Sequence, residues 1–216
     1  CLSDETRKHL CDTAVALAEA VQYLGAGTLE YLYDDVSKEF YFIEMNTRIQ
    51  VEHPVTEMLT GFDLVQEMIK VAGGADLSMT QEQIERTGHA IEVRLNAEDP
   101  YLQFMPFPGK VTSLKIPQGE GIRFDHFLYE GYQIPPFYDS LIGKLIVHGT
   151  DRADAIRKMA AALEDLEIGG LKTTAPLHSA LARDPGVAAG DFHTQWLEPW
   201  LAAGNLQSAN VTGGAA

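Results

Sequence analysis

The chain has 216 residues, of which 45% are hydrophobic, and its formal net charge is −15. This length allows one sizeable core, or two small domains that share an interface. A chain this acidic repels a phosphate backbone, so we expect neither nucleic acid nor an anionic membrane surface as a partner. An anionic substrate would need a metal ion or a few well-placed arginines. We also expect no bilayer-spanning segment and no secretory signal.

The two cysteines, Cys1 and Cys11, both lie near the start, and no framework of spaced cysteines follows. This usage predicts reduced thiols in a cytoplasmic protein, with the mitochondrion as the alternative in a eukaryote. Cys11 lies within residues 4–23, which we predict to be a helix, and we expect it to be an inert buried thiol.

The first part of the chain predicts a helix, a hairpin and a second helix. Apolar residues recur at helical spacing over residues 4–23 and 56–72. Two β-like runs lie between these helices, at residues 28–33 and 40–52. The polar residues 34–39 between the runs are typical of a hairpin loop.

The second part changes to short β-like runs punctuated by Pro and Gly. A capping-box pattern, Thr80 with Gln83, precedes them. The predicted strands are residues 90–96, 110–115, 121–127 and 141–148, and the predicted helices are 151–167, 175–183 and 194–203. The tail over 204–216 is rich in Gly, Ala, Ser and Asn, and we expect it to be disordered. The change of texture predicts an α+β fold with a domain boundary near residue 86.

One run carries most of the polar chemistry. In a strand over residues 43–52, side chains would alternate between two faces. One face would be apolar, and the other would hold Glu44, Asn46, Arg48, Gln50 and Glu52. On periodicity alone, a solvated polar face is the simpler interpretation.

The hairpin adds a second carboxylate to this face if Glu30 pairs across from Glu44. Two opposed carboxylates repel each other, but a divalent cation between them makes the pair favourable. Magnesium suits such a site, because it binds one or two carboxylates together with water and substrate phosphates. Asn46, two residues along the same face, would add an oxygen.

The same face offers groups for an anion and for proton transfer. The planar guanidinium of Arg48 suits a carboxylate-like anion such as bicarbonate. Glu52 would lie near that anion and serve as a general base. Burial would raise the pKa of Glu52 toward that role, while the adjacent arginine would oppose the change.

Five segments resemble biotin carboxylases in sequence, order and spacing. They are residues 44–57 (EMNTRIQVEHPVTE), 25–30 (GAGTLE), 88–99 (GHAIEVRLNAED), 108–110 (PGK) and 135–140 (PPFYDS). The resemblance covers essentially the whole chain except the tail. It implies the C-terminal part of an ATP-grasp domain over residues 1–86, and a strand-rich biotin carboxylase C-terminal domain over 87–203.

The resemblance implies roles for the hairpin residues in nucleotide and metal binding. Glu30 and Glu44 would bind magnesium, or manganese, and through it the phosphates of ATP. Asn46 would help to bind a second metal ion, and Leu32 would lie against the adenine.

It also implies the residues that act on bicarbonate. Arg48, Gln50 and the backbone of Val51 would hold this anion, and Glu52 would deprotonate it for attack on the γ-phosphate. The resulting carboxyphosphate would break down to carbon dioxide and phosphate, and the phosphate would take a proton from biotin.

Residues of the second part have weaker signals. The resemblance implies that Arg94 stabilises the enolate oxygen of biotin, although the alternation around it also fits an exposed strand charge. Asp139 is a weaker binding-site candidate, because it also fits a plain turn. We expect His53 and His89 to be structural hydrogen-bonding residues rather than ligands.

The resemblance further implies a homodimer, a biotin carboxyl carrier protein and a carboxyltransferase subunit or domain as partners. The chain has no Ala-Met-Lys-Met motif for biotin attachment, so biotin would arrive on the carrier. Acetyl-CoA is the expected final acceptor, with propionyl-CoA and methylcrotonyl-CoA next. Family members are longer at the N-terminus and carry a glycine-rich lid there, so we expect these 216 residues to be inactive alone. The alternatives are another ATP-grasp ligase, such as a carbamoyl-phosphate type, or a non-catalytic dimerisation fragment.

Overall fold

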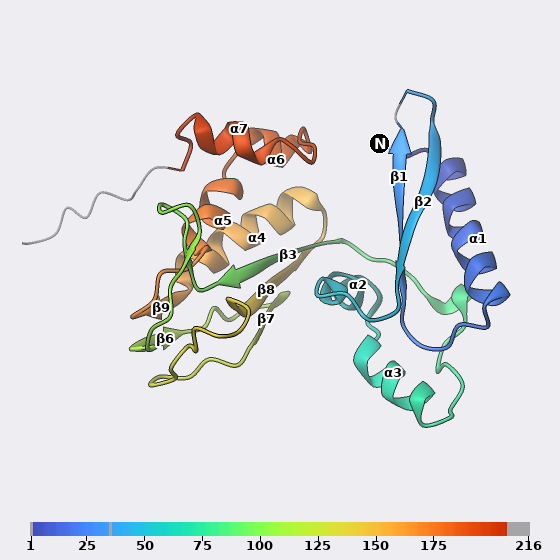
Figure 1. Ribbon diagram of the computed structural model, residues 1–216, viewed down its shortest axis with the longest axis horizontal. Coiled ribbons are helices and arrows are strands. Elements are labelled where there is room, and N and C mark those ends of the chain that lie inside the picture. The colour runs from blue at the N-terminus through green and yellow to red at the C-terminus, as the bar shows by residue number, and fades with distance from the viewer. Residues whose placement is uncertain (1, 35, 207–216) are drawn as a thin grey trace, which may run out of the picture. The chain divides into compact units, whose positions relative to one another are not determined.

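A computed structural model describes residues 2–34 and 36–206. The chain divides into two compact units, residues 1–85 (the first unit) and 86–216 (the second unit). Both units mix helices and strands, which confirms the predicted α+β class (Figure 1). Among the described residues, no helix has the length and apolar character needed to cross a membrane.

The first unit begins with a helix that packs beside a β-hairpin (Figure 1). Helix α1 spans Asp4–Ala20, and the hydroxyl of Ser3 caps it by accepting the Thr6 backbone N–H. Strands β1 (Thr28–Asp34) and β2 (Glu39–Asn46) form the antiparallel hairpin. Cys11 is exposed on α1, so the expectation of a buried thiol is wrong.

A β-bulge decides which residues share a face of the hairpin. Glu30 pairs with Glu44, but the next residue, Tyr31, pairs with Phe42, so Ile43 is the extra residue. Such a bulge shifts the alternation of side chains by one position. Glu44 therefore lies on the face of Glu30, while Phe42 turns to the opposite face with Tyr31.

The predicted strand over 40–52 is too long, because β2 ends at Asn46. Residues 47–52 form bends and a turn, and helix α2 (His53–Thr60) follows at once. Pro54 is in the first turn of α2, where a proline favours a helix start. Only Glu44 and Asn46 of the predicted polar row are therefore in a strand.

The predicted single helix over 56–72 is also wrong. It is two helices, α2 and α3 (Leu64–Ala72). Gly61 ends α2 in the left-handed conformation, with φ of 76°, which glycine adopts without strain. Asp63 then caps α3 by accepting the Gln66 backbone N–H at 2.8 Å. The predicted capping box at Thr80 and Gln83 is present, on a short 3-10 helix, Gln81–Gln83.

The second unit is built on a three-stranded antiparallel sheet in the order β3-β8-β7. The sheet strands are β3 (His89–Asn96), β8 (Leu141–Gly149) and β7 (Ile122–His126). Two small strand pairs accompany it: β4 (Glu98–Asp99) with β5 (Met105–Pro106), and β6 (Ser113–Lys115) with β9 (Glu167–Gly169). The predicted strand over 110–115 is thus shorter than expected, since Lys110 makes only an isolated bridge to Gln133.

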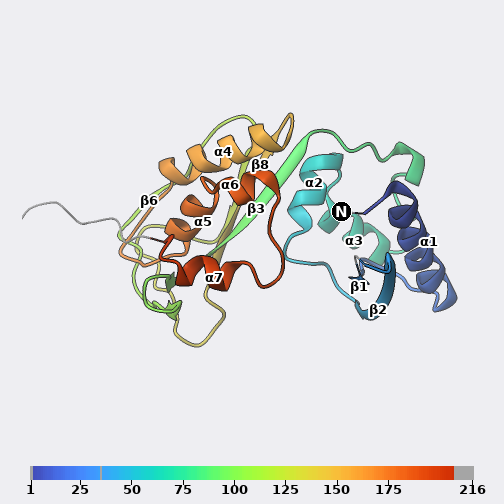
Figure 2. The same cartoon turned by 90° about the horizontal axis from the view of Figure 1, so that it is seen from above.

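The described part of the second unit also contains α4 (Arg152–Asp165), α5 (Ala175–Leu181), α6 (Pro185–Ala189) and α7 (Leu197–Ala202), as Figure 2 shows. Helix α4 packs on β8 and β3, and Asp151 caps it. The core between them includes Leu95, Leu145, Val147 and Met159. The predicted disordered tail falls outside the described residues from 207 onward; within its described part, the amide of Asn205 donates to the Trp200 carbonyl at 2.8 Å.

Candidate active site

Two carboxylates face each other across the hairpin. Glu30 and Glu44 are register partners, so the condition on which the metal site depended in the sequence analysis is met. The side-chain Nδ2 of Asn46 donates to Glu30 Oε1 at 2.8 Å and to Glu44 Oε1 at 3.3 Å. The partial positive charge of this amide N–H group thus lies between the two carboxylates. A cation would be favourable at the same place. Both glutamates are exposed and so are accessible from solution.

The two carboxylates fit a magnesium ion whose remaining ligands would be waters and phosphate oxygens of the substrate. The described residues contain no group of three or more His, Cys, Asp or Glu side chains that could hold a metal ion alone. Magnesium does not need such a group, because it keeps several waters and often binds one or two carboxylates plus phosphate oxygens. Asn46 turns its NH₂ group toward the glutamates, so its Oδ1 would reach a metal ion there only after the amide rotates.

Arg48 links the end of the hairpin to the segment that follows. Its Nη1 donates to Gln50 Oε1 at 3.0 Å and to the Ile49 carbonyl at 3.2 Å. Its Nη2 lies 3.4 Å from Asn46 Oδ1. The side chains predicted to hold an anion, Arg48 and Gln50, are therefore in direct contact and close to the acidic pair.

A cavity of about 290 Å³ lies within the first unit beside these groups. The cavity is lined by residues just before and at the start of β1, by the segment after β2, and by the starts of α2 and α3. These residues are Ala26, Gly27, Thr28, Arg48, Ile49, Gln50, Glu52, His53, Thr56 and Leu64. Gly27 allows close packing at this wall, because a Cβ there would lie 2.7 Å from the Met45 Cε atom and 2.9 Å from the Tyr23 ring. Three of the predicted bicarbonate residues thus line one cavity.

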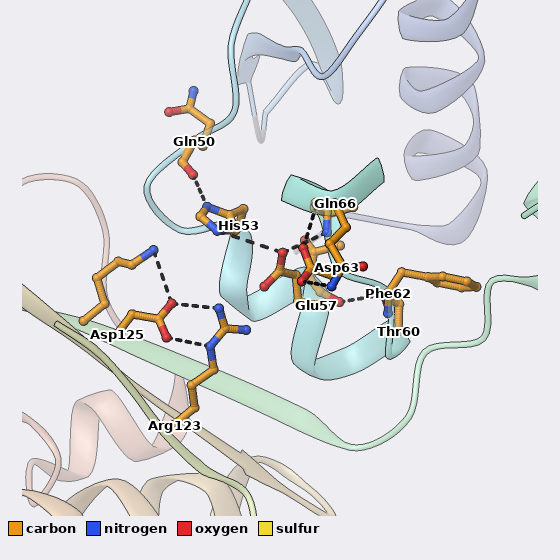
Figure 3. Close-up of polar contacts among 12 residues, drawn as sticks. Gln50, His53, Glu57, Thr60, Phe62, Asp63, Gln66, Arg123 and Asp125 are labelled. Carbon is orange, nitrogen blue, oxygen red and sulfur yellow. Dashed lines mark hydrogen bonds and ion pairs between the residues drawn. The ribbon is translucent and has the colours of Figure 1, made fainter. Parts of the chain in front are cut away.

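Glu52 and Val51 belong to the turn that precedes α2. Glu52 is the N-cap residue of α2, yet its side chain makes no capping hydrogen bond. Figure 3 shows how the next residue, His53, is held: its Nδ1 lies 2.7 Å from the Gln50 carbonyl oxygen. On the other side of the ring, Nε2 lies 4.0 Å from Glu57 Oε1. His53 is therefore a structural hydrogen-bonding residue, as predicted.

Leu32 lies on the hairpin face that carries the acidic pair. It is two residues from Glu30 along β1, pairs with Tyr41, and is 61% exposed. An exposed leucine beside a possible phosphate site is free to contact an apolar ring. The adenine role remains a prediction.

Arg94 is in the second unit, on the central part of β3. It pairs with Lys144 of β8, which in turn pairs with Asp125 of β7. Two cations directly opposite each other are unfavourable, and the carboxylate at the end of this row offsets them. Asp125 lies 3.9 Å from Lys144 and also receives two hydrogen bonds from Arg123, at 2.8 and 2.7 Å (Figure 3).

The backbone at Arg94 is fixed from the α5 side. Its carbonyl accepts the Thr174 hydroxyl at 3.1 Å and the His178 Nε2–H at 2.7 Å. Burial lowers the pKa of His178, which favours the neutral imidazole that makes this single donation. The strand position of Arg94 is thus well defined, while its side chain is exposed.

Two other sequence candidates have local structural partners. Asp139 Oδ1 accepts the Leu141 backbone N–H at 2.8 Å, which is the plain turn arrangement. His89 Nε2 lies 3.4 Å from Arg152 Nη1, and burial lowers the pKa of His89.

The carboxylate of Glu57 is a site residue that the sequence analysis missed. It is buried behind His53 and accepts the Leu64 backbone N–H at 2.9 Å. Its signals in the sequence are its place at the end of the 44–57 segment and four residues after His53, on the same helix face.

Comparison with known proteins places both units. A family model described as the biotin carboxylase C-terminal domain matches residues 92–199, and the ATP-binding domain of the carbamoyl-phosphate synthase L chain matches residues 1–80. Biotin carboxylase 1 of Bacillus subtilis is 49% identical over 204 residues, which are 94% of this chain and 45% of that protein. A pyruvate carboxylase subunit of Methanothermobacter thermautotrophicus is 49% identical over 199 residues, 92% of this chain and 40% of that protein.

Solved structures give the same result. The biotin carboxylase domain dimer of Hydrogenobacter thermophilus 2-oxoglutarate carboxylase, in complex with MgADP, ADP and bicarbonate, has a TM-score of 0.91 and 44% identity. The match covers 96% of this chain and 45% of that one. The biotin carboxylase of Campylobacter jejuni has a TM-score of 0.86 and 45% identity, with 92% and 44% coverage. This chain therefore spans less than half the length of the relatives it matches.

Proposed function

The chain belongs to the biotin carboxylase family, and we propose that it forms part of an enzyme that carboxylates biotin with ATP and bicarbonate. One observation carries the proposal. An acidic pair that fits a metal ion, Glu30 with Glu44, is joined through Asn46 and Arg48 to a cavity that contains Gln50 and Glu52. Such a site brings a nucleotide phosphate and a small anion close together.

The nucleotide half of the proposed site is the hairpin. Glu30 and Glu44 would hold magnesium or manganese, which neutralises the phosphate oxygens of ATP and supplies charge stabilisation during phosphoryl transfer. Asn46 would assist at a second metal ion, and Leu32 would lie against the adenine.

The bicarbonate half is the segment after the hairpin. Arg48, Gln50 and the backbone of Val51 would bind the anion, with the guanidinium matching two of its oxygens. Glu52 would take the proton of bicarbonate, whose oxygen then attacks the γ-phosphorus and breaks its bond to ADP. The residues thereby position the two reactants, which is the main contribution a protein makes to this step.

The product, carboxyphosphate, would break down to carbon dioxide and phosphate. Phosphate would remove the ureido N–H proton of biotin, and the nitrogen would attack carbon dioxide to give carboxybiotin. The Arg94 guanidinium would stabilise the negative oxygen that forms on biotin. Asp139 is a further candidate for biotin binding.

We propose a homodimer that works with a biotin carboxyl carrier protein and a carboxyltransferase subunit or domain. Acetyl-CoA ranks first as the final acceptor. Propionyl-CoA and methylcrotonyl-CoA come next, and pyruvate is a further candidate, because one relative is named as part of a pyruvate carboxylase. A cytoplasmic location, or a mitochondrial one in a eukaryote, stays a prediction.

Another ATP-grasp ligase is the alternative function, since residues 1–80 match the ATP-binding domain of a carbamoyl-phosphate synthase. A non-catalytic dimerisation fragment is disfavoured by the intact set of polar residues from Glu44 to Glu52.

The test is ADP release by the full-length gene product with bicarbonate, with and without free biotin. We expect biotin to stimulate release, and both Glu52→Gln and Arg48→Ala to abolish the stimulation. ADP release that is independent of biotin would establish the alternative ligase.

A further inference from the structure

Three of the proposed bicarbonate groups are on one tight turn. The turn runs from Gln50 to His53, and the His53 backbone N–H closes it onto the Gln50 carbonyl oxygen at 3.3 Å. Gln50, Val51 and Glu52 therefore have their positions set by the geometry of this turn. Its preceding segment contains no regular structure after β2 ends at Asn46.

The His53 side chain closes the turn a second time. Its Nδ1 lies 2.7 Å from the same Gln50 carbonyl, and since a carbonyl only accepts, Nδ1 carries the hydrogen. The side-chain bond is shorter than the 3.3 Å backbone bond. The imidazole is therefore the stronger of the two contacts that hold this carbonyl.

The ring itself is fixed by buried surroundings. The His53 and Glu57 side chains are 14% and 7% exposed, and Nε2 faces Glu57 Oε1 at 4.0 Å. Glu57 is held in turn by the Leu64 backbone N–H, at the start of α3. Glu57 and His53 thus connect the start of α3 to the turn through successive contacts.

We propose that His53 is a positioning residue for the bicarbonate step, acting through the turn on Gln50 and Glu52. It does not act on bicarbonate itself. Its Nδ1 donation to the Gln50 carbonyl holds the turn in the shape that aims the Gln50 amide and the Glu52 carboxylate at one anion. This inference rests on the proposed function.

Replacement of the histidine by isosteric amides separates this role from a general loss of structure. In Asn, Nδ2 occupies the place of the histidine Nδ1, whereas in Gln the amide reaches the place of Nε2. In the full-length gene product, we expect His53→Leu to raise the KM for bicarbonate tenfold or more and to lower kcat, with the KM for ATP within twofold of wild type. His53→Asn should recover much of this loss, and His53→Gln should not.

His148→Leu is the matched control, because His148 Nε2 also lies 2.8 Å from a backbone carbonyl, that of Thr87, in the second unit. We expect its kinetic constants to stay within twofold of wild type. Unchanged bicarbonate kinetics in His53→Leu, or equal increases in the KM values for ATP and bicarbonate without recovery in His53→Asn, would overturn the positioning role alone. A wild-type protein without biotin-dependent ADP release would overturn the proposed function and this inference together.

Discussion

The second unit buries an apolar core that includes Leu95 and Leu145, both fully inaccessible to solvent. Among the described residues of the first unit, the buried ones are Pro54, Glu57 and Glu67. Apolar burial is the main favourable term in folding, so stability should reside in the second unit. The first unit instead carries the acidic pair and the cavity that we propose for bicarbonate. The unit that carries the proposed metal and bicarbonate groups is therefore not the unit with the larger apolar core.

Expression of the units separately gives the largest expected effect. We expect residues 86–206 to unfold in one cooperative transition in urea, because their core lies within that unit. Residues 1–85 should show no cooperative transition, since their apolar side chains, Leu24 and Ile69 among them, are exposed. Circular dichroism measures both. A sharp transition for residues 1–85 alone would contradict the assignment of stability to the second unit.

A matched pair of leucine substitutions compares the contributions of the two units to the free energy of unfolding. In the 216-residue chain, Leu145→Ala removes a fully buried side chain and should lower the free energy of unfolding by about 2–5 kcal/mol. Leu32→Ala removes an exposed side chain of the first unit and should change it by less than about 0.5 kcal/mol. Urea titration compares the two variants, and equal losses would contradict the assignment of stability to the second unit.

Substitution of the acidic pair should alter metal use rather than stability. In the full-length gene product, we expect Glu44→Gln to weaken the apparent affinity for magnesium about tenfold, a loss of about 1.4 kcal/mol. The physical reason is the loss of one of two opposed carboxylates. Glu39→Gln, at the other end of the same strand, is the control and should leave magnesium dependence unchanged. An unaltered magnesium titration for Glu44→Gln would remove this residue from the metal site.

The smallest effect concerns the C-terminal helices. The Trp200 Nε1–H and the Gly186 and Val187 backbone N–H groups donate to the Asp184 carboxylate, which lowers its pKa. A depressed pKa means that Asp184 stabilises the fold above its unfolded pKa of about 3.9, and that this contribution disappears as the pH falls through the lower folded value.

Asp184→Asn should therefore lower the unfolding temperature of residues 86–206 at pH 7, and the deficit should shrink below about pH 4. The fluorescence of the two tryptophans, Trp196 and Trp200, follows the transition. Asp191→Asn, on an exposed side chain nearby, is the control and should have little effect at either pH. A deficit that is constant with pH would show that the carboxylate charge is not responsible.

The two β-like runs and the short polar loop between them predict the hairpin, but they leave its register open, so the pairing of Glu30 with Glu44 is known only from the structure. The sequence does not reveal the bulge at Ile43. Phe42 and Glu44 are two residues apart, so simple alternation predicts that they share a face, whereas the bulge places them on opposite faces. The same pattern also predicts a strand that continues past Asn46. The proline after His53 is the signal that the alternation has ended.

The helices show the same limit. Apolar spacing predicts helix over 56–72, but Gly61 and the capping Asp63 divide it, and both signals are visible in the sequence. The contact between His53 and the Gln50 carbonyl is different in kind. It depends on the turn from Gln50 to His53, and no periodic pattern in the sequence indicates the shape of a turn.

The most direct test of the central claim, that bicarbonate attacks ATP at the Arg48–Glu52 segment, uses bicarbonate labelled with oxygen-18. Attack of a bicarbonate oxygen on the γ-phosphorus transfers that atom to the released phosphate. For the full-length gene product with ATP, magnesium and biotin, we expect one labelled oxygen in each phosphate formed, and loss of this labelled product in Glu52→Gln. Phosphate that gains its fourth oxygen from solvent, with no label from bicarbonate, would show that water attacks ATP, and would contradict the proposal.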